Sequence, residues 1–530
     1  MTYNLNFQNA SPIDFSIQKN REEFATSVDS FWQSVSKKAE SVYPIVAGKE
    51  IKQGKQIERI SPNDGLTKLA NVTLADTELA TQSLNKLEAA KASWRRTSLT
   101  ERAAILDRAA DIMTKRRLEL CAIIVHEAAK NWHQSDLDVI EAIDFCRYYA
   151  ELARQSLSSF TVANLPGETN DYHYQPAGLA VIISPWNFPL AIPCGMLVAS
   201  LVAGNVAVLK PAEQASLIAR ELVKCLFEAG LPKDVLAFLP GKGEEIGPVL
   251  TSAKETQLIC FTGSLAVGKE ILKNCGQVNE DDRYIKKAIL ELGGKNALII
   301  DEDADLDEAI KGILYASFAY SGQKCSACSR LIVVGTAYQT LVDRLIPAAA
   351  ELIIGPSYES ASFVGPVIDA EAQTRLLASI EAAQNSTELL FKSEVPDSGT
   401  FVPITIFNQP GALQTVWNEE LFGPVLAIKK VDNFNAAIEL ANNSKYALTG
   451  GIYSRSPKNI ALAKSELEVG NLYINRSCTG AIVGRQPFGG YKLSGIGSKA
   501  GGPDYLKQFV VPKVISENTM RRGFAPDIES

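Results

Sequence analysis

The chain has 530 residues, of which 46% are hydrophobic and 21% are charged, and its formal net charge at pH 7 is −7. This composition is typical of a globular protein, and the length exceeds the size at which one hydrophobic core normally stops growing, so we expect two or more domains. The net negative charge excludes the basic surface of a nucleic-acid-binding protein, and we expect no nucleic-acid partner.

The cysteines and the apolar stretches indicate the compartment. Nine cysteines, an odd number spread along the chain, favour free thiols in a reducing environment over a disulfide framework. The first residues, M-T-Y-N-L-N-F-Q, have neither the basic nor the apolar segment of a signal peptide. Prolines and asparagines interrupt the most apolar stretch, residues 179–209, which therefore cannot form a membrane helix. We expect a cytoplasmic protein with no membrane partner.

The N-terminal third is predicted to be largely helical. Residues 1–60 are polar and mixed, and they predict an extended arm with one short helix near residues 22–39. Ser98-x-x-Glu101 has the form of a capping box, in which side chains satisfy the free amides of a first helical turn. Another helix is predicted over residues 135–154, where apolar residues recur at helical spacing.

Two separate segments could pair as strands. Residues 171–176, D-Y-H-Y-Q-P, alternate aromatic with polar residues, as a strand outside the main body does. An ordinary surface hairpin fits this pattern equally well. Near the end of the chain, residues 509–511 form the strand-like run F-V-V, which could pair with that segment.

A regular alternation of strands and helices follows. Strand-like runs lie at residues 179–184, 205–210, 235–239 and 258–262, separated by helical stretches at about 193–203, 214–229, 244–252 and 265–274. This alternation predicts a doubly wound, Rossmann-type sheet of parallel strands that binds its ligand at their carboxyl ends. A second α/β unit is predicted from Asn296, with strand-like runs at 296–301, 330–335, 401–407, 425–431, 448–454 and 470–476.

One acidic stretch in the second unit imitates a metal loop. Asp301-x-Asp303-x-Asp305 has the spacing of calcium ligands but lacks the glycine and the terminal glutamate that a calcium loop requires. We interpret it as a loop that caps the next helix.

Three stretches at predicted strand ends suit a dinucleotide. Gly241-x-Gly243-x-x-x-Gly247 has one residue too many for the dinucleotide fingerprint and is weak evidence alone. In F-T-G-S (261–264), a strand meets a helix whose free amides suit a pyrophosphate. Glu213 follows a strand and could accept hydrogen bonds from a ribose diol while repelling a 2′-phosphate, which favours NAD over NADP. A carboxylate at a helix N-terminus is the simpler alternative for Glu213.

The centre of the predicted chemistry is Cys325, within S-G-Q-K-C-S-A-C-S-R (321–330). Most free cysteines are buried and inert, but small and polar neighbours would let this sulfur face a cleft. Cys325-x-x-Cys328 also has the spacing of a redox or half-zinc motif. No second pair exists and the chain has only three histidines, so we expect no metal.

A cysteine nucleophile needs a base, because the thiolate is the reactive form. The best candidate is Glu291, which ends a strand-like run immediately before L-G-G-K (292–295). This position predicts a carboxylate at a sheet edge, where clefts form. A solvated surface carboxylate is the alternative.

Together these stretches resemble the aldehyde dehydrogenase superfamily. The resemblance extends over nearly the whole chain, through E-L-G-G-K and G-Q-K-C and through S-P-W-N-F-P-L (184–190), K-P-A-E (210–213), F-T-G-S (261–264), E-E-L-F-G-P-V (419–425) and Q-P-F-G-G (486–490). It implies an α/β, aldehyde-dehydrogenase-like fold of three parts. These are a Rossmann-type NAD-binding domain at 1–165 and 179–291, an α/β catalytic domain at 292–500, and a small β oligomerisation flap at 166–178 and 501–530.

The resemblance also implies roles for individual residues. Cys325 would be the nucleophile and Glu291 the general base, while Asn187 and the Cys325 backbone N–H would donate to the developing oxyanion. Lys210 and Glu213 would hold the adenosine ribose. The complete set implied for NAD is Ser184, Trp186, Lys210, Glu213, Gly241, Ser264, Glu420 and Phe422.

Two stretches are similar to one branch of the superfamily, the L-glutamate γ-semialdehyde (Δ1-pyrroline-5-carboxylate) dehydrogenases. They are G-Q-K-C-S-A-C-S-R and S-C-T-G-A-I-V-G-R-Q-P-F-G-G (477–490), whereas Y-K-L-S-G-I-G-S-K-A (491–500) is a less familiar form of that branch's loop. A hydroxyl and two backbone amides would form a nest for the substrate's α-carboxylate. A tight turn and ordinary core packing are the alternatives. The substrate-binding residues implied are Glu141, Phe188, Ser326, Gly480, Ala481 and Phe488.

The implied activity is NAD-dependent oxidation of L-glutamate γ-semialdehyde to L-glutamate through a thiohemiacetal and a thioester, the second step of proline degradation. The resemblance further implies a homo-oligomer, a dimer or dimer-based, and a functional partnership with a proline dehydrogenase, a domain that residues 1–60 could not encode. Oxidation of another semialdehyde, CoA acylation by the same cysteine, and a catalytically silent relative stay open. The retained Glu291 weighs against CoA acylation, which does not need activated water.

Overall fold

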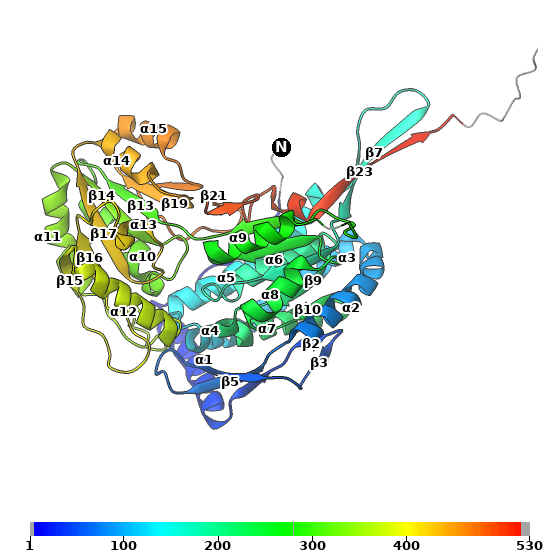
Figure 1. The fold of residues 1–530 in the computed structure, drawn as a ribbon, viewed down its shortest axis with the longest axis horizontal. Helices are drawn as coiled ribbons and strands as arrows, with labels where there is room; N and C mark the ends of the chain where they lie inside the picture. The colour runs from blue at the N-terminus through cyan, green and yellow to red at the C-terminus, as the bar shows by residue number, and fades with distance from the viewer. Residues whose placement is uncertain (1–4, 279, 521–530) are drawn as a thin grey trace, which may run out of the picture.

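The computed structural model describes residues 5–278 and 280–520. Two α/β bodies lie side by side, and a long β-ribbon projects from the larger one (Figure 1). Within these two ranges, no helix is both long and apolar enough to cross a membrane.

The larger body is built on an eight-stranded sheet in the order β22-β12-β11-β8-β9-β10-β2-β3. Its five central strands are parallel, as the alternation predicts, and nearly every residue of β8 and β9 is buried. The chain runs from β8 outward to β10 and then returns to the other side of β8, so the strand order reverses between β8 and β11. The eight strands are β2 (Ile45–Val46), β3 (Lys49–Glu50), β8 (Leu179–Ile183), β9 (Val206–Lys210), β10 (Leu236–Phe238), β11 (Leu258–Thr262), β12 (Lys287–Glu291) and β22 (Gly495–Ile496).

Helices cover both faces of this sheet (Figure 1). At α3 the serine half of the predicted capping box is present, because the Ser98 hydroxyl accepts a hydrogen bond from the Glu101 amide at 3.1 Å, while the Glu101 carboxylate pairs with Arg108. The helices are α1 (Gln18–Lys37), α2 (Thr77–Arg96), α3 (Leu99–Lys115), α4 (Arg117–Glu127), α5 (Trp132–Ser156), α6 (Ala191–Val202), η1 (Glu213–Ala215), α7 (Ser216–Glu228), α8 (Gly243–Ser252) and α9 (Leu265–Gly276).

The predicted N-terminal arm is wrong in one respect. After α1 the chain does not stay apart, because β2 and β3 extend the large sheet. Three further strands, β1 (Glu40–Val42), β4 (Gln56–Ile60) and β5 (Lys68–Thr73), form a separate small sheet. Strands β1, β2 and β3 have only two or three residues and are too short to show an alternating pattern, so the sequence gives no sign of these three.

The smaller body is a seven-stranded sheet in the order β15-β16-β17-β14-β13-β19-β20, parallel except for β15 at one edge. The aspartate stretch caps α10 as predicted, since the Asp305 carboxylate accepts from the Asp307 and Glu308 amides. The strands are β13 (Asn296–Ile300), β14 (Cys328–Val334), β15 (Glu388–Lys392), β16 (Thr405–Asn408), β17 (Val425–Val431), β19 (Thr449–Tyr453) and β20 (Asn471–Ile474). The helices are α10 (Leu306–Phe318), η2 (Ala319–Gly322), α11 (Ala337–Ala350), α12 (Ala370–Gln384), α13 (Thr415–Asn418), α14 (Phe434–Asn442) and α15 (Pro457–Glu466), and a two-stranded sheet joins β18 (Tyr446–Ala447) to β21 (Tyr491–Lys492).

The projecting ribbon pairs β7 (Glu168–Pro176) with β23 (Val510–Asn518), and β6 (Phe160–Thr161) flanks β7. Val510 lies opposite Pro176, so the predicted pairing of these two segments is confirmed. Residues 501–509 differ from the predicted flap, because η3 (Tyr505–Phe509) buries its aromatic residues in the core of the larger body. Residues 521–530 of that prediction lie outside the described residues. The division into domains stays a prediction.

Candidate active site

The reversal of strand order places several motif residues at one edge of the large sheet. In open α/β sheets such a reversal leaves a crevice at the carboxyl ends of the strands. Residues 184–188 follow β8, residues 263–264 follow β11, and Glu291 is the last residue of β12. The crevice therefore forms where the sequence predicts the nucleotide and the general base.

Cys325 reaches this crevice from the smaller body through an unusual turn. Tyr320, Ser321 and Gly322 all have left-handed backbones, with φ of 55°, 56° and 67°. Non-glycine residues adopt this conformation only where their surroundings hold it. The Tyr320 hydroxyl donates to the Ala128 carbonyl at 2.8 Å and the Ser321 hydroxyl to the Gly365 carbonyl at 2.6 Å. Two buried hydrogen bonds thus fix the approach to the cysteine.

The glycines of E-L-G-G-K bring the parts of the site close together. A Cβ at Gly294 would lie 2.7 Å from the Cys325 carbonyl oxygen, and a Cβ at Gly293 would collide with the Glu420 carboxylate. The Gly294 amide donates to Glu420 Oε1 at 3.0 Å, and Asn296 Nδ2 donates to the Cys325 carbonyl at 2.7 Å. We expect any larger side chain at positions 293 and 294 to push these groups apart.

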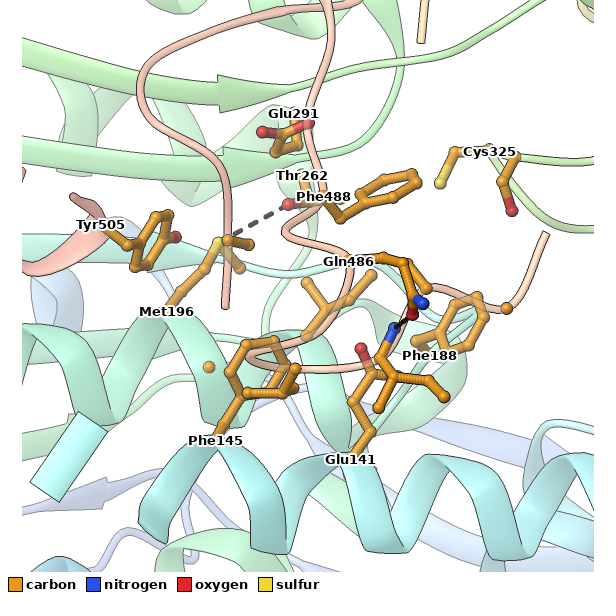
Figure 2. A pocket seen from close by; sticks show the side chains of 18 of the residues that line it. Glu141, Phe145, Phe188, Met196, Thr262, Glu291, Cys325, Gln486, Phe488 and Tyr505 are labelled. Carbon is orange, nitrogen blue, oxygen red and sulfur yellow. Dashed lines mark hydrogen bonds between the residues drawn. The ribbon is translucent and has the colours of Figure 1, made fainter. Parts of the chain in front are cut away.

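Two cavities meet at the sulfur. Cys325 and Glu291 line both of them, together with Thr262 and Leu292. All nine cysteines lie in the described part of the chain, and Cys325 is half-buried whereas the other eight are buried. Figure 2 shows the first cavity, into which Glu141 and Phe145 reach from α5. The thiol is therefore open to two different ligands.

Every residue that the sequence predicts for the substrate lines this first cavity. The Gly480 backbone is left-handed, with φ +81°, and a Cβ there would meet no atom within 4 Å, so the left-handed backbone and not crowding favours glycine. Burial raises the pKa of Glu141 to about 8, so its carboxyl group is largely neutral at pH 7. The predicted residues found here are Glu141, Phe188, Ser326, Gly480, Ala481 and Phe488.

The second cavity is lined by Trp186, Asn187, Ser264, Glu420 and Phe422. The Trp186 and Phe422 rings meet edge to face, with centroids 5.5 Å apart. The Ser264 hydroxyl caps α9, whose N-terminus opens here with its positive dipole end. An anionic, ring-bearing ligand such as the pyrophosphate and nicotinamide of NAD fits this arrangement.

The other four residues predicted for NAD line neither cavity. Ser184 precedes Trp186 by two residues, and its buried hydroxyl has no hydrogen-bond partner among the described residues. Lys210 Nζ lies 3.2 Å from Glu213 Oε1, which also accepts from the Gly243 amide at 2.8 Å. Glu213 therefore contacts a helix N-terminus, the simpler alternative, while Gly241 packs against the Ala75 carbonyl.

Asn187 is held as an oxyanion donor should be. Its side chain is buried and donates from Nδ2 to the Gln323 carbonyl at 3.1 Å, which leaves the second proton of the amide for another acceptor. The backbone carbonyl of Asn187 accepts from the buried Lys130 at 2.9 Å, and Lys130 in turn pairs with Asp138 at 2.8 Å. One hydrogen bond thus orients the side-chain amide and another holds the backbone of the same residue.

Burial dominates the electrostatics of the reacting groups. It raises the pKa of the Cys325 thiol, and the Glu420 and Glu291 carboxylates raise it further, while a hydrogen bond from the Ser326 amide lowers it. Burial also raises the pKa of Glu291 to about 8 and that of Glu420 to about 7. Glu291 Oε2 is buried without a hydrogen-bond partner among the described residues, as is suitable for a group that must receive a proton.

Some residues of the site were not predicted. Thr262 lies within F-T-G-S and could have been named with Ser264, but Arg375 of α12 belongs to a helix that carries no motif. Met196 and Tyr505 line the first cavity although their sequence contexts resemble ordinary core. No group of three or more potential metal ligands occurs among the described residues.

Comparison with known proteins gives a consistent result. The model of the aldehyde dehydrogenase family matches residues 50–515. A 1-pyrroline-5-carboxylate dehydrogenase of Geobacillus kaustophilus is 42% identical, and 1-pyrroline-5-carboxylate dehydrogenase 2 of Bacillus subtilis is 40% identical, each over 95% of this chain and 98% of the relative.

Solved structures agree with these relatives. The 1-pyrroline-5-carboxylate dehydrogenase from Thermus with bound NAD superimposes with a TM-score of 0.94 at 36% identity, over 98% of this chain and 100% of that one. Proline utilization A from Bdellovibrio bacteriovorus gives 0.96 at 45% identity, over 99% of this chain and 55% of that one. This chain thus spans about half the length of that protein. The predicted α/β fold is confirmed.

Proposed function

This chain belongs to the aldehyde dehydrogenase family, and from that premise we propose that it oxidises L-glutamate γ-semialdehyde, formed from 1-pyrroline-5-carboxylate, to L-glutamate with NAD. One observation carries the proposal. Cys325 is the half-buried thiol at the junction of two cavities, one suited to NAD and the other lined by Ser326, Gly480 and Ala481, the residues predicted to bind the α-carboxylate. This activity is the second step of proline degradation.

The first step joins the substrate to the protein. The Cys325 thiolate attacks the aldehyde carbon and forms a thiohemiacetal, while the carbonyl oxygen becomes an oxyanion. The Asn187 amide and the Cys325 backbone N–H would donate to that oxygen. Ser326, Gly480 and Ala481 would hold the α-carboxylate at the far end, so the aldehyde is aimed at the sulfur.

The second step releases the product. NAD, when bound in the second cavity, accepts a hydride from the carbon that Cys325 holds. The resulting thioester is hydrolysed by a water molecule whose proton Glu291 accepts, and the Cys325 thiolate leaves as the carbon–sulfur bond breaks. The phenyl rings of Phe188 and Phe488 would pack against the aliphatic chain. The products are glutamate and the free thiolate, which is ready for another aldehyde.

The direct test mixes the purified protein with NAD and pyrroline-5-carboxylate and follows NADH absorbance. We expect NADH and glutamate in equal amounts without coenzyme A. A requirement for coenzyme A would favour the acylating alternative. NADH formation with other semialdehydes but not with this substrate would overturn the proposed specificity.

Turnover should rise with pH between about 6 and 9. Glu291 accepts a proton only as a carboxylate, and burial raises its pKa to about 8, so the active fraction grows as the pH rises through that value. The measurement is kcat at saturating NAD and substrate across this range. A kcat that falls with rising pH over the same interval would contradict the role of Glu291.

Replacing Asn187 with alanine should lower kcat by about 10²–10³-fold, the usual effect of removing one oxyanion donor. The loss should fall on kcat more than on KM, because the donor acts on the charge that develops during the reaction. Steady-state kinetics of N187A check this. A rise in KM with unchanged kcat would instead assign Asn187 to substrate binding.

We also propose a homo-oligomer, a dimer or dimer-based, assembled through the projecting ribbon. β23 is the outer strand of its sheet and exposes Val511 and Val514, so its free edge and apolar side chains suit a second copy. Light scattering of the intact chain and of a V511D/V514D variant tests this. An unchanged mass would exclude the ribbon as the contact.

Residence in the cytoplasm is supported by the nine cysteines, all of them free thiols. A functional partnership with a proline dehydrogenase is supported by the match to proline utilization A, of which this chain covers only part. Pull-down with such a dehydrogenase, or kinetics of the coupled pair, would test the partnership.

A further inference from the structure

Lys499 lies beside the general base, in the loop between β22 and η3. It belongs to the stretch 491–500, which differs from the usual loop of the branch that the sequence resembles. Its ammonium donates to the Gly470 carbonyl at 2.8 Å, to Asn471 Oδ1 at 3.0 Å and to the Gly489 carbonyl. All three acceptors are neutral oxygens. No hydrogen-bonded anion therefore cancels the charge of Lys499; burial lowers the pKa of Lys499, and the nearby Glu291 carboxylate raises it.

The backbone that Lys499 holds is the backbone that contacts Glu291. A Cβ at Gly489 would lie 2.6 Å from Glu291 Oε1 and 3.5 Å from Lys499 Cα, so Gly489 fills the space between the two residues. On the other side, Glu291 pairs with Gly495 of β22. A shift of the Gly489 carbonyl would thus change the position of the carboxylate.

The charged and titratable groups facing Glu291 come from three elements. They are Lys499, Cys325 and Tyr505, and the Gly490 amide donates to the carboxylate as well. Among them Lys499 supplies the positive charge, and it lowers the Glu291 pKa against the burial that raises it. Removing this charge would leave the carboxylate facing only neutral or potentially negative groups.

We propose that Lys499 is a positioning residue for water activation, whose ammonium holds Gly489 against Glu291 and whose charge keeps that carboxylate available as the base. This role rests on the proposed function, because it concerns the step that hydrolyses the Cys325 thioester. A lysine that merely fastened the loop to β20 would act through its hydrogen bonds alone. Charge and hydrogen bonding can be separated by substitution.

The test compares three variants by the pH dependence of kcat. K499M removes both the charge and the donors, K499Q keeps donors without the charge, and K499R keeps both. We expect K499M and K499Q to move the acid limb of kcat to higher pH by about one unit, with much of the rate regained at high pH, and K499R to retain the original profile. K492M is the matched control, because Lys492 lies nearby in the sequence, at the end of β21, but pairs with Glu468 at the surface.

Two results would overturn the proposal. One is a K499M or K499Q rate reduced by the same factor at every pH, which would indicate only a structural role; the other is no change in any variant. Since K499Q and K499R both retain hydrogen-bond donors for the loop, the two can be compared even where K499M does not fold. Absence of NADH formation by the unaltered protein would refute the proposed function. If the unaltered protein is active and the Lys499 variants have the same pH dependence of kcat, only the role of Lys499 is refuted.

Discussion

Replacing Cys325 with alanine is expected to lower NADH formation from pyrroline-5-carboxylate by roughly four orders of magnitude or more. The sulfur forms the covalent bond that holds the substrate carbon during hydride transfer, and no neighbouring group can replace it. Cys328, the nearest other thiol in sequence, is buried and lines neither cavity. Steady-state kinetics of C325A measure the loss.

NAD binding should survive in the same variant. The residues of the second cavity stay in place, and alanine leaves the Asn296 bond to the backbone carbonyl at position 325 intact. Calorimetric titration with NAD checks this. C121A is the matched control, because Cys121 is a fully buried thiol of α4 outside both cavities, and it should retain activity. Normal turnover in C325A would remove the proposed nucleophile.

Replacing Glu291 with glutamine should lower steady-state turnover by roughly 10²–10⁴-fold. Glutamine keeps the shape of the side chain but cannot accept the proton of the attacking water. Hydride transfer precedes that attack, so the first turnover should still produce NADH equal to the number of active sites. Stopped-flow absorbance resolves this first turnover from the slow phase that follows.

E58Q provides the control for E291Q. Glu58 lies on β4 in an exposed ion pair with Lys68, and such pairs contribute little to stability. We expect E58Q to show unaltered first and later turnovers. Loss of the NADH burst in E291Q, with full activity in E58Q, would show that Glu291 is needed before or during hydride transfer and not only in the later hydrolysis.

The sequence predicted the reacting residues of this site better than the segments that surround them. Cys325, Glu291 and Asn187 were predicted because short motifs with fixed backbone requirements carry them, and the structure brings all three to one cleft. The parallel strands of the larger sheet were predicted because buried strands read as continuous apolar runs, whereas the smaller sheet was predicted only as a second α/β unit. Their central order follows from the handedness and packing rules of such sheets.

The remaining features depend on contacts between distant segments. The two-residue strands β2 and β3 have no pattern of their own, and the aromatic residues of η3 resemble those of the neighbouring flap until their burial is known. Lys499 is an ordinary loop lysine in the sequence. Only the folded chain shows that its ammonium holds the carbonyl of Gly489 beside the general base.

The account depends on a covalent acyl intermediate at a single sulfur. The most direct measurement is mass spectrometry of E291Q quenched after mixing with NAD and pyrroline-5-carboxylate, followed by digestion. We predict a glutamyl thioester on the peptide that contains Cys325, in an amount equal to the NADH formed. NADH formation with Cys325 unmodified, or with the acyl group on any other residue, would contradict the account.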